Sequence, residues 1–161
     1  MNIIHESFKH GDNFRIGHFC IIEEDVVVGD NVNIQNYVLL KKGTKIGNDV
    51  YVDSYVRSSG DNKIGNNVTL RFGATIAREV TIGDGVFISP NVMTIYSDHA
   101  GKAMPGTEIG DGVHIGTAAV IGPAVYIRDR AVVGAMAFVK ANADLDADGI
   151  YIGIPAKKLE R

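Results

Sequence analysis

A six-residue repeat runs through most of this chain of 161 residues. From Ile16 to Val92 an aliphatic residue returns at every sixth position of thirteen hexads, with one failure at Ser58. Four positions after each aliphatic residue stands a second, mostly small residue, which is Asn62 in the failed hexad. Such regularity predicts a solenoid, because each short unit can bury its apolar side only by stacking on its neighbours.

The spacing inside each hexad predicts short strands joined by tight corners. The small residue and the next aliphatic residue are two positions apart, so they share one side of an extended segment, and the residue between them points outward. Asn, Asp or Gly fills the third corner position in nine of the thirteen hexads, and these residues enter positive φ at the lowest cost. A helix would need a 3.6-residue period and would not tolerate this many glycines. The expected fold is all-β.

The motif [LIV]-G-x-x-[small]-x, as in Ile46–Tyr51, resembles the hexapeptide-repeat acyltransferase superfamily and, within it, the sugar and nucleotide-sugar acetyltransferases. The resemblance implies a left-handed parallel β-helix, a triangular prism in which three hexads form one coil. We expect this domain to span residues 1–145, with one protruding loop at 94–108 and a short C-terminal tail, 146–161, packing on the helix.

A coil of eighteen residues sorts the outward side chains into three faces. One face would carry five residues, Ile21, Leu39, Arg57, Thr75 and Met93. A monomer rarely leaves an apolar patch such as Ile21, Leu39 and Met93 exposed. We therefore expect cyclic self-association, and the family resemblance implies a homotrimer.

Two further features of the repeat are interpreted as structural. Phe19, Tyr37 and Tyr55 are spaced eighteen apart, so we expect them to stack on one corner as a packing ladder and not as a ligand site. The segment Ser58–Lys63 replaces an apolar hexad with a polar one, which we interpret as a small outward bulge.

Composition limits the partners and the compartment. The net charge of −3 argues against nucleic acid, which requires a basic face. The single cysteine, Cys20, cannot form an intramolecular disulfide, which favours a reducing compartment. Residues 1–10 lack the layout of a signal peptide, and the longest uncharged run, 115–127, is too short to span a bilayer. We expect a cytoplasmic protein without a membrane partner.

The repeat is interrupted after Val92 and resumes at Ile109. From Ile88 to Ile109 is 21 residues, three more than a full coil. Either three residues bulge from two disturbed strands, or nine project as a longer loop from one. Loops on a rigid scaffold are where chemistry tends to lie.

The interrupted segment contains Asp98 and His99, whose position resembles that of the catalytic histidine of sugar O-acetyltransferases. The resemblance implies that His99 is the general base, and a neutral imidazole suits the removal of a proton from an attacking hydroxyl or amine. Asp98 is the candidate to orient His99, with Glu79 and Glu108 as alternatives. The alternative is that Asp98 and His99 are ordinary polar loop residues in solvent without a catalytic role.

The last coils, 115–120 and 133–140, look like those along which coenzyme A lies in this superfamily. Small side chains would let the pantetheine arm approach the backbone, although the prism corners alone also favour small residues. The lysines of the terminal segment would face the nucleotide phosphates, unless they form a solvated tail. The implied cofactor-binding residues are Gly116, Thr117, Ala118, Gly134, Ala135, Ala137, Lys140, Pro155, Lys157 and Lys158.

Two departures from the superfamily pattern concern the coenzyme. Met136 stands where the superfamily usually has glycine, and Lys140-Ala141 replaces the usual Thr-Lys. The phosphate contact is therefore expected from a shifted lysine.

Three function classes remain open. The first is an acyltransferase that uses acetyl-CoA as co-substrate and acylates an amine or hydroxyl of a sugar or nucleotide-linked sugar by direct attack on the thioester. The second is a γ-carbonic-anhydrase-like zinc protein. Residues 34–36 resemble its early motif, but zinc requires three convergent imidazoles and Ala119 stands where a histidine paired with His114 is needed, so we expect no metal. The third is a non-catalytic scaffold.

Overall fold

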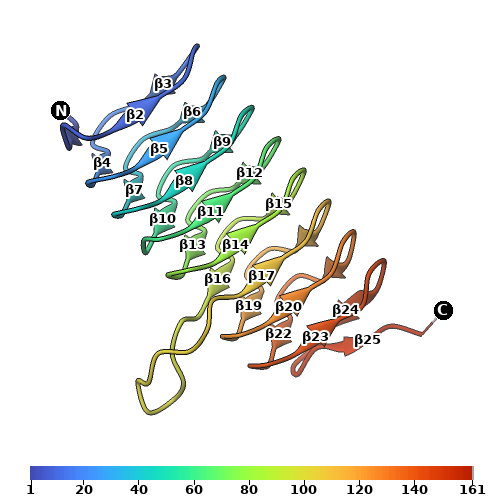
Figure 1. The fold of residues 1–161 in the computed structure, drawn as a ribbon. Coiled ribbons are helices and arrows are strands. Elements are labelled where there is room, and N and C mark those ends of the chain that lie inside the picture. Colours follow the sequence, from blue (N-terminus) through green and yellow to red (C-terminus); the bar gives the residue numbers. More distant parts are fainter. Residues whose placement is uncertain (161) are drawn as a thin grey trace.

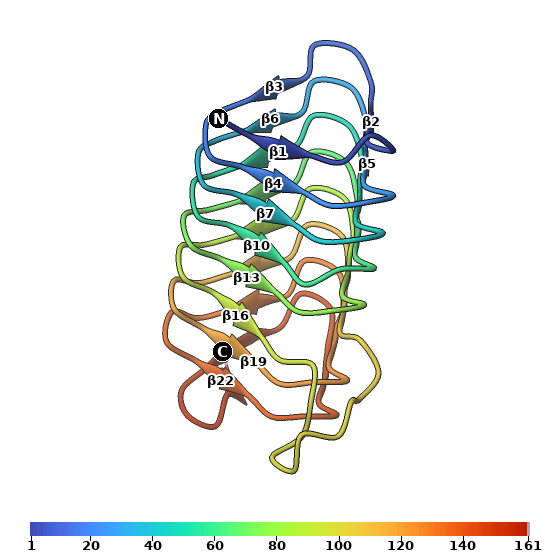
Figure 2. The same cartoon turned by 90° about the vertical axis from the view of Figure 1, so that its left-hand side faces the viewer.

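The computed structural model describes residues 1–160 as a single parallel β-solenoid of triangular cross-section (Figure 1). Each strand pairs with the strand one coil before and one coil after it, so the three sides of the prism are three parallel sheets. Sheet A faces the viewer in Figure 2. We name the three corners by the sheets that they join, in chain direction: edge AB, edge BC and edge CA.

The strands are two residues long, except β24. Sheet A contains β1 (Ile3–Ile4), β4 (Ile21–Ile22), β7 (Leu39–Leu40), β10 (Arg57–Ser58), β13 (Thr75–Ile76), β16 (Met93–Thr94), β19 (Val120–Ile121) and β22 (Phe138–Val139). Sheet B contains β2 (Lys9–His10), β5 (Val27–Val28), β8 (Lys45–Ile46), β11 (Lys63–Ile64), β14 (Thr81–Ile82), β17 (Glu108–Ile109), β20 (Tyr126–Ile127) and β23 (Asp144–Leu145). Sheet C contains β3 (Arg15–Ile16), β6 (Asn33–Ile34), β9 (Tyr51–Val52), β12 (Thr69–Leu70), β15 (Phe87–Ile88), β18 (His114–Ile115), β21 (Val132–Val133), β24 (Ile150–Ile152) and the antiparallel β25 (Lys157–Lys158).

The core follows the hexad pattern. The second residue of each strand from β4 to β22 and the small residue two positions earlier are buried. The third corner position repeatedly has positive φ, for example 57° at Asp25 and 55° at Asn31. Coils are also joined along edge BC by a side-chain ladder, in which Asp30 Oδ1 accepts a hydrogen bond from the Asp12 N–H at 2.7 Å. These observations confirm the inward and outward assignment made from the sequence.

The face assignment and the aromatic ladder are confirmed too. In sheet A, Arg57 pairs in register with Leu39 on one side and Thr75 on the other. The Phe19 and Tyr37 rings stack at 5.1 Å between centroids, and Tyr37 and Tyr55 at 4.9 Å, along edge CA. Tyr37 is thus stacked between Phe19 and Tyr55, as the spacing of eighteen predicted.

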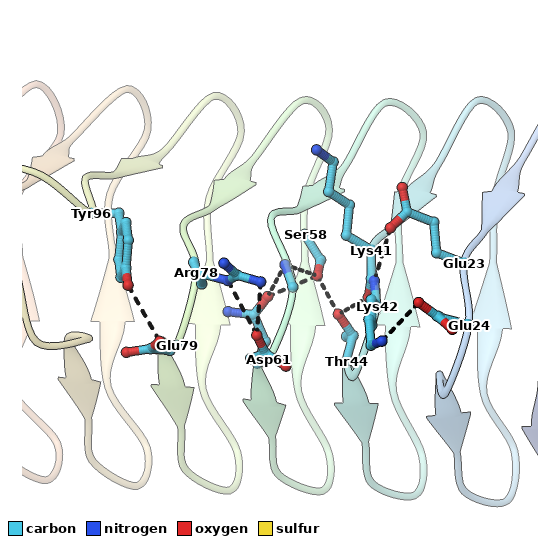
Figure 3. Close-up of polar contacts among 12 residues, drawn as sticks. Glu23, Glu24, Lys41, Lys42, Thr44, Ser58, Asp61, Arg78, Glu79 and Tyr96 are labelled. Atoms are coloured by element: carbon cyan, nitrogen blue, oxygen red, sulfur yellow. Dashed lines mark hydrogen bonds and ion pairs between the residues drawn. The ribbon is translucent and has the colours of Figure 1, made fainter. Parts of the chain in front are cut away.

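The polar hexad does not bulge, which corrects the expectation for Ser58–Lys63. Ser58 pairs in register with Leu40 and Ile76, and Ser58 and Asn62 are 2% and 0% exposed. The Ser58 hydroxyl contacts the Thr44 hydroxyl (Figure 3) and donates to Asn62 Oδ1 at 2.7 Å. Asn62 Nδ2 donates to the Ala77 carbonyl at 2.6 Å. These polar groups satisfy one another inside the prism, so the chain has no reason to leave the repeat.

The interruption is a single inserted loop. Thr81 pairs with Glu108, 27 positions later, whereas Lys63 pairs with Thr81 at the ordinary interval of 18. Nine residues are therefore inserted at edge AB, which decides between the two alternatives. Thr94 and Glu108, counted with the loop in the sequence, lie in β16 and β17.

Within the part of the chain that the structure describes, no helix is long and apolar enough to cross a membrane.

The C-terminal residues continue edge CA and then turn back: β24 pairs with β21 in parallel, and β25 pairs with β24 antiparallel. The Ala156 N–H donates to the Phe138 carbonyl at 2.7 Å, so this turn covers the last strand of sheet A.

Candidate active site

The loop leaves β16, passes along edge AB toward the C-terminal coils and returns at β17 (Figure 2). Two contacts attach its ends to the solenoid. The Tyr96 hydroxyl donates to Glu79 Oε1 at 3.3 Å (Figure 3), and the Ala124 N–H donates to the Pro105 carbonyl at 3.1 Å. At Gly106 a Cβ would lie 2.0 Å from the Glu79 carbonyl oxygen, so only glycine permits this close approach. The base of the loop is held and its tip projects.

Asp98 organises the loop tip. Its Oδ1 accepts hydrogen bonds from the N–H groups of Ala100 and Lys102, both at 2.9 Å, and its own N–H donates to the Lys102 carbonyl at 3.0 Å. The carboxylate proposed to orient His99 is thus used by the backbone around it. Asp98 shapes the turn on which His99 stands.

His99 is exposed at this tip. Its ring makes no hydrogen bond within residues 1–160. The alternative orienting carboxylates lie elsewhere: Glu79 accepts from Tyr96, and Glu108 points outward from sheet B. The pKa of the Tyr96 phenol is raised by burial first and by the neighbouring Glu79 carboxylate second.

The small residues predicted to contact coenzyme A lie along edge CA, in two successive coils. Gly116, Thr117 and Ala118 follow β18, and Gly134 and Ala135 follow β21. A Cβ at Gly116 would lie 2.5 Å from the Ala135 nitrogen, so that glycine is required by the stacking of the coils themselves. Ala137 is 1% exposed and belongs to the core.

The backbone N–H at one corner position of edge CA is hydrogen-bonded in some coils and not in others. The His18 N–H donates to Asn36 Oδ1 at 2.8 Å and the Ser54 N–H to Asp53 Oδ1 at 2.8 Å. The equivalent N–H groups of Thr117 and Ala135, like that of Phe72, make no hydrogen bond within residues 1–160. The side chains of Thr117 and Ala135 are small and exposed, so a chain of amide groups can approach this backbone. The residues therefore fit a pantetheine arm.

The predicted lysines do not gather at one place. Lys140 follows β22 and lies on edge AB, whereas Lys157 and Lys158 lie in β25 of sheet C. Lys158 Nζ is 2.8 Å from Asp146 Oδ2, and this hydrogen bond raises the pKa of the lysine. Lys157 is exposed and forms no ion pair among residues 1–160. Pro155 lies in the turn before β25.

The two histidines nearest the interrupted coil lie on different parts of the prism. His114 points outward from sheet C, with its ring stacked on Phe87 at 5.1 Å and its Nε2 3.5 Å from Ser89 Oγ. His99 is carried by edge AB. Over residues 1–160 no three His, Cys, Asp or Glu side chains are grouped so that they could share a metal ion.

The structure thus brings together only part of the predicted site. Thr117, Ala118 and Ala135 share edge CA with the terminal turn, while His99, Asp98 and Lys140 belong to edge AB, and sheet A lies between the two edges. Sequence reasoning missed the contact of Tyr96 with Glu79 and the buried Thr44, Ser58 and Asn62 network. The latter had a signal, since all three polar residues occupy inward positions of the repeat.

The model of the family described as "GMPPB C-terminal domain" matches residues 1–98, more than half of the chain. No curated protein matches it.

Three solved structures are similar over nearly the whole chain. UDP-N-acetylglucosamine O-acyltransferase (LpxA) from Moraxella catarrhalis has 20% identity and a TM-score of 0.77, covering 98% of this chain and 72% of that chain. UDP-N-acetylglucosamine acyltransferase from Campylobacter jejuni has 22% identity and a TM-score of 0.72, with the same coverage of 98% and 72%. A mutant of AntD, an N-acyltransferase from Bacillus cereus in complex with dTDP and coenzyme A, has 20% identity and a TM-score of 0.60, covering 96% and 84%.

At such low identities these similarities establish the fold. They confirm the left-handed parallel β-helix of hexapeptide repeats that the sequence predicted. They also confirm the structural resemblance to the hexapeptide-repeat acyltransferases.

Proposed function

This chain belongs to the GMPPB C-terminal domain family, and from that premise we propose that it uses the β-helix as a coenzyme A-dependent acyltransferase. The acyl group is most simply acetyl, and the acceptor an amine or hydroxyl of a sugar or nucleotide-linked sugar. The observation that carries the proposal is the one inserted loop, which presents His99 to solvent on an otherwise regular solenoid. The fold is shared with proteins named as nucleotide-sugar acyltransferases, which supports the same chemistry here.

The coenzyme would bind along edge CA, and the acceptor would be activated from edge AB. Bound acyl-coenzyme A supplies the acyl group as an activated thioester. The N–H groups of Thr117 and Ala135 would donate to amide carbonyls of the pantetheine arm, and Lys157 would face the phosphates as a point charge. His99 would remove the proton from the acceptor as its oxygen or nitrogen attacks the thioester carbonyl. The carbon–sulfur bond then breaks, and the coenzyme leaves as its thiol with the proton that His99 had taken.

A direct assay tests this function. Acetyl-CoA is incubated with the protein and a panel of amino sugars, nucleotide sugars and simple glycosides, and the release of the coenzyme thiol is followed. We expect release that depends on one class of acceptor. Absence of release with every acceptor, together with no binding of coenzyme A in calorimetry, would rule the proposal out.

Asp98 provides a first prediction about the loop. Asp98→Asn keeps an oxygen that can accept from the N–H groups of Ala100 and Lys102, whereas Asp98→Ala removes it. We expect the asparagine variant to retain turnover within about threefold, and the alanine variant to lose about tenfold or more because His99 is no longer held. Steady-state kinetics measures both variants. A loss as large in Asp98→Asn as in Asp98→Ala would mean that the carboxylate charge acts on His99.

We also propose that the protein is a homotrimer, because a site that uses both edge AB and edge CA requires a neighbouring copy. Sheet A provides an apolar face for this contact, with Ile21 and Met93 exposed at 40% and 48%. We predict a light-scattering mass three times that of one chain at micromolar concentration.

The double variant Ile21→Glu/Met93→Glu should be monomeric, because a charge in each position must be desolvated in the contact. Val27→Glu is the matched control, since Val27 is 38% exposed but lies on sheet B. A monomeric parent protein, or dissociation caused equally by the control, would contradict the use of sheet A.

A further inference from the structure

The two arms of the inserted loop are bonded to each other along their length. The Met104 N–H donates to the Tyr96 carbonyl at 2.9 Å, and Ser97 forms an antiparallel bridge with Ala103. Backbone hydrogen bonds at the tip continue this pairing. Because the arms support each other, a displacement at the base of the loop moves the tip, where His99 stands.

Both arms contact Glu79 at the base of the loop. The first arm contacts its side chain, because the Tyr96 hydroxyl donates to Glu79 Oε1 at 3.3 Å (Figure 3). The second arm contacts its backbone, since a Cβ at Gly106 would lie 2.0 Å from the Glu79 carbonyl oxygen. One residue of the solenoid therefore attaches the loop at both of its ends.

The corner that carries Glu79 is itself fixed by neighbouring coils. Glu79 has a φ of 61°, and its N–H donates to the Gly60 carbonyl at 3.1 Å. In the same corner the Ala77 carbonyl accepts from Asn62 Nδ2 at 2.6 Å. The Ala77 N–H donates to Thr94 Oγ1, also at 2.6 Å, and the buried Thr94 ends β16, from which the loop departs. Glu79 thus connects the loop to a rigid part of the molecule.

We propose that Glu79 is a positioning residue for His99: by holding both arms of the loop it fixes where the imidazole stands relative to the solenoid. Its carboxylate is bonded to Tyr96 and not to the imidazole, so it acts through the loop. A misplacement of about 1 Å can lower a rate by roughly 10², so a contact this far from the reacting atoms should be visible in turnover. The proposal rests on the proposed function, in which His99 is the general base.

Limited proteolysis with trypsin tests the attachment without any need for activity. Lys102 is exposed in the loop, and cleavage after it gives fragments 1–102 and 103–161, which mass spectrometry identifies. Glu79→Ala should raise the rate of this cleavage about fivefold, because the loss of one hydrogen bond increases the population of the detached loop.

Asp25→Ala is the matched control for proteolysis. Asp25 occupies the equivalent corner position of edge AB, with a φ of 57°, and lies three coils before Glu79. The two variants therefore remove an exposed carboxylate from the same kind of corner. The cleavage rate after Lys102 should change less than about twofold in Asp25→Ala, since no contact to the loop is lost.

Two further variants identify the contact that matters. Glu79→Gln keeps an oxygen that can accept from the Tyr96 hydroxyl, so its cleavage rate should stay within about twofold of the parent protein. Tyr96→Phe removes the donor and should raise the rate as Glu79→Ala does. The double variant Tyr96→Phe/Glu79→Ala should not exceed the larger single effect, because both changes remove the same hydrogen bond.

Steady-state kinetics tests the positioning of His99. Glu79→Ala should lower kcat by about fivefold or more and leave the KM for the coenzyme unchanged, because Thr117 and Ala135 lie on edge CA. Glu79→Gln should keep the kcat of the parent protein. In a His99→Asn background, Glu79→Ala should lower turnover no further, since the group that it positions is already absent.

Three results would overturn the proposal. The first is a cleavage rate in Glu79→Ala equal to that in Asp25→Ala. The second is faster cleavage with an unchanged kcat, and the third is the same loss of kcat with and without His99. If no acceptor causes thiol release in the parent protein, the acyltransferase function fails, while faster cleavage in Glu79→Ala still supports the attachment of the loop by Glu79.

Discussion

His99→Asn is expected to lower turnover by roughly 10²–10⁴, the contribution of a positioned acid–base group, while coenzyme binding and the solenoid stay intact. His99 is exposed at the loop tip and contributes nothing to the core. The loss should therefore fall on kcat, with little effect on the affinity for coenzyme A. Steady-state kinetics with a working acceptor measures the first quantity and calorimetry the second.

The pH dependence of the same variant gives a sharper result. A general base works only after it has lost its own proton, so kcat/KM of the parent protein should rise with pH, and this limb should be absent in His99→Asn. An amine acceptor adds a second, higher limb through its own deprotonation, which the variant should keep.

The matched control is His5→Asn, because His5 is an exposed histidine on the same edge of the prism at its opposite end. That variant should keep the activity and the pH profile of the parent protein. Activity of His99→Asn within about threefold of the parent would place the base elsewhere. The reaction would then depend on positioning and on an amine that arrives already neutral.

Asn62→Ala is expected to lower the free energy of unfolding by about 3 kcal/mol, which is large for one residue. Asn62 is fully buried and accepts from Ser58 while donating to the Ala77 carbonyl. Removing the amide leaves the buried Ala77 carbonyl without its donor and Ser58 with only the Thr44 hydroxyl, and also leaves a cavity. Urea denaturation followed by circular dichroism gives the change, provided that the transition remains cooperative.

Two further variants show whether the loss comes from unsatisfied polar groups. Asn66→Ala removes an exposed amide that accepts from the Asn48 N–H at 2.8 Å, and water can replace it, so the loss should stay near about 1 kcal/mol. The triple variant Thr44→Val/Ser58→Val/Asn62→Val removes the hydroxyl and amide partners together. It leaves the Ala77 carbonyl unpaired, as Asn62→Ala does, but its apolar side chains fill the cavity, so its cost should not exceed that of Asn62→Ala. An equal loss in Asn66→Ala and Asn62→Ala would contradict this account.

The misinterpreted hexad shows why sequence reasoning failed there. Ser58 and Asn62 are polar, so the sequence predicted an outward bulge that would avoid burying them unsatisfied. Besides each other, their partners are Thr44 and the Ala77 carbonyl, which are 14 and 15 positions away. Only the stacking of one coil on the next brings such groups together.

The candidate site was predicted in part for the same kind of reason. The sequence located the interruption and the residues inside it, because a break in a strict period is visible locally. It could not choose between two disturbed strands and one long loop, since that depends on the pairing of Thr81 with Glu108 across the interruption. Nor could it show that Asp98 is occupied by the N–H groups of Ala100 and Lys102.

The sequence by itself determined the features that repeat every six residues. These are the short strands, the inward aliphatic and small positions, the corners with positive φ, and the sorting of outward residues into faces. Each of these follows from the alternation of an extended segment and the conformational cost of a tight corner. The tertiary structure decided which groups meet across coils, namely the buried Asn62 network and the placing of His99 and Thr117 on different edges. Those contacts join residues about one coil or more apart, and a local period carries no information about their distance.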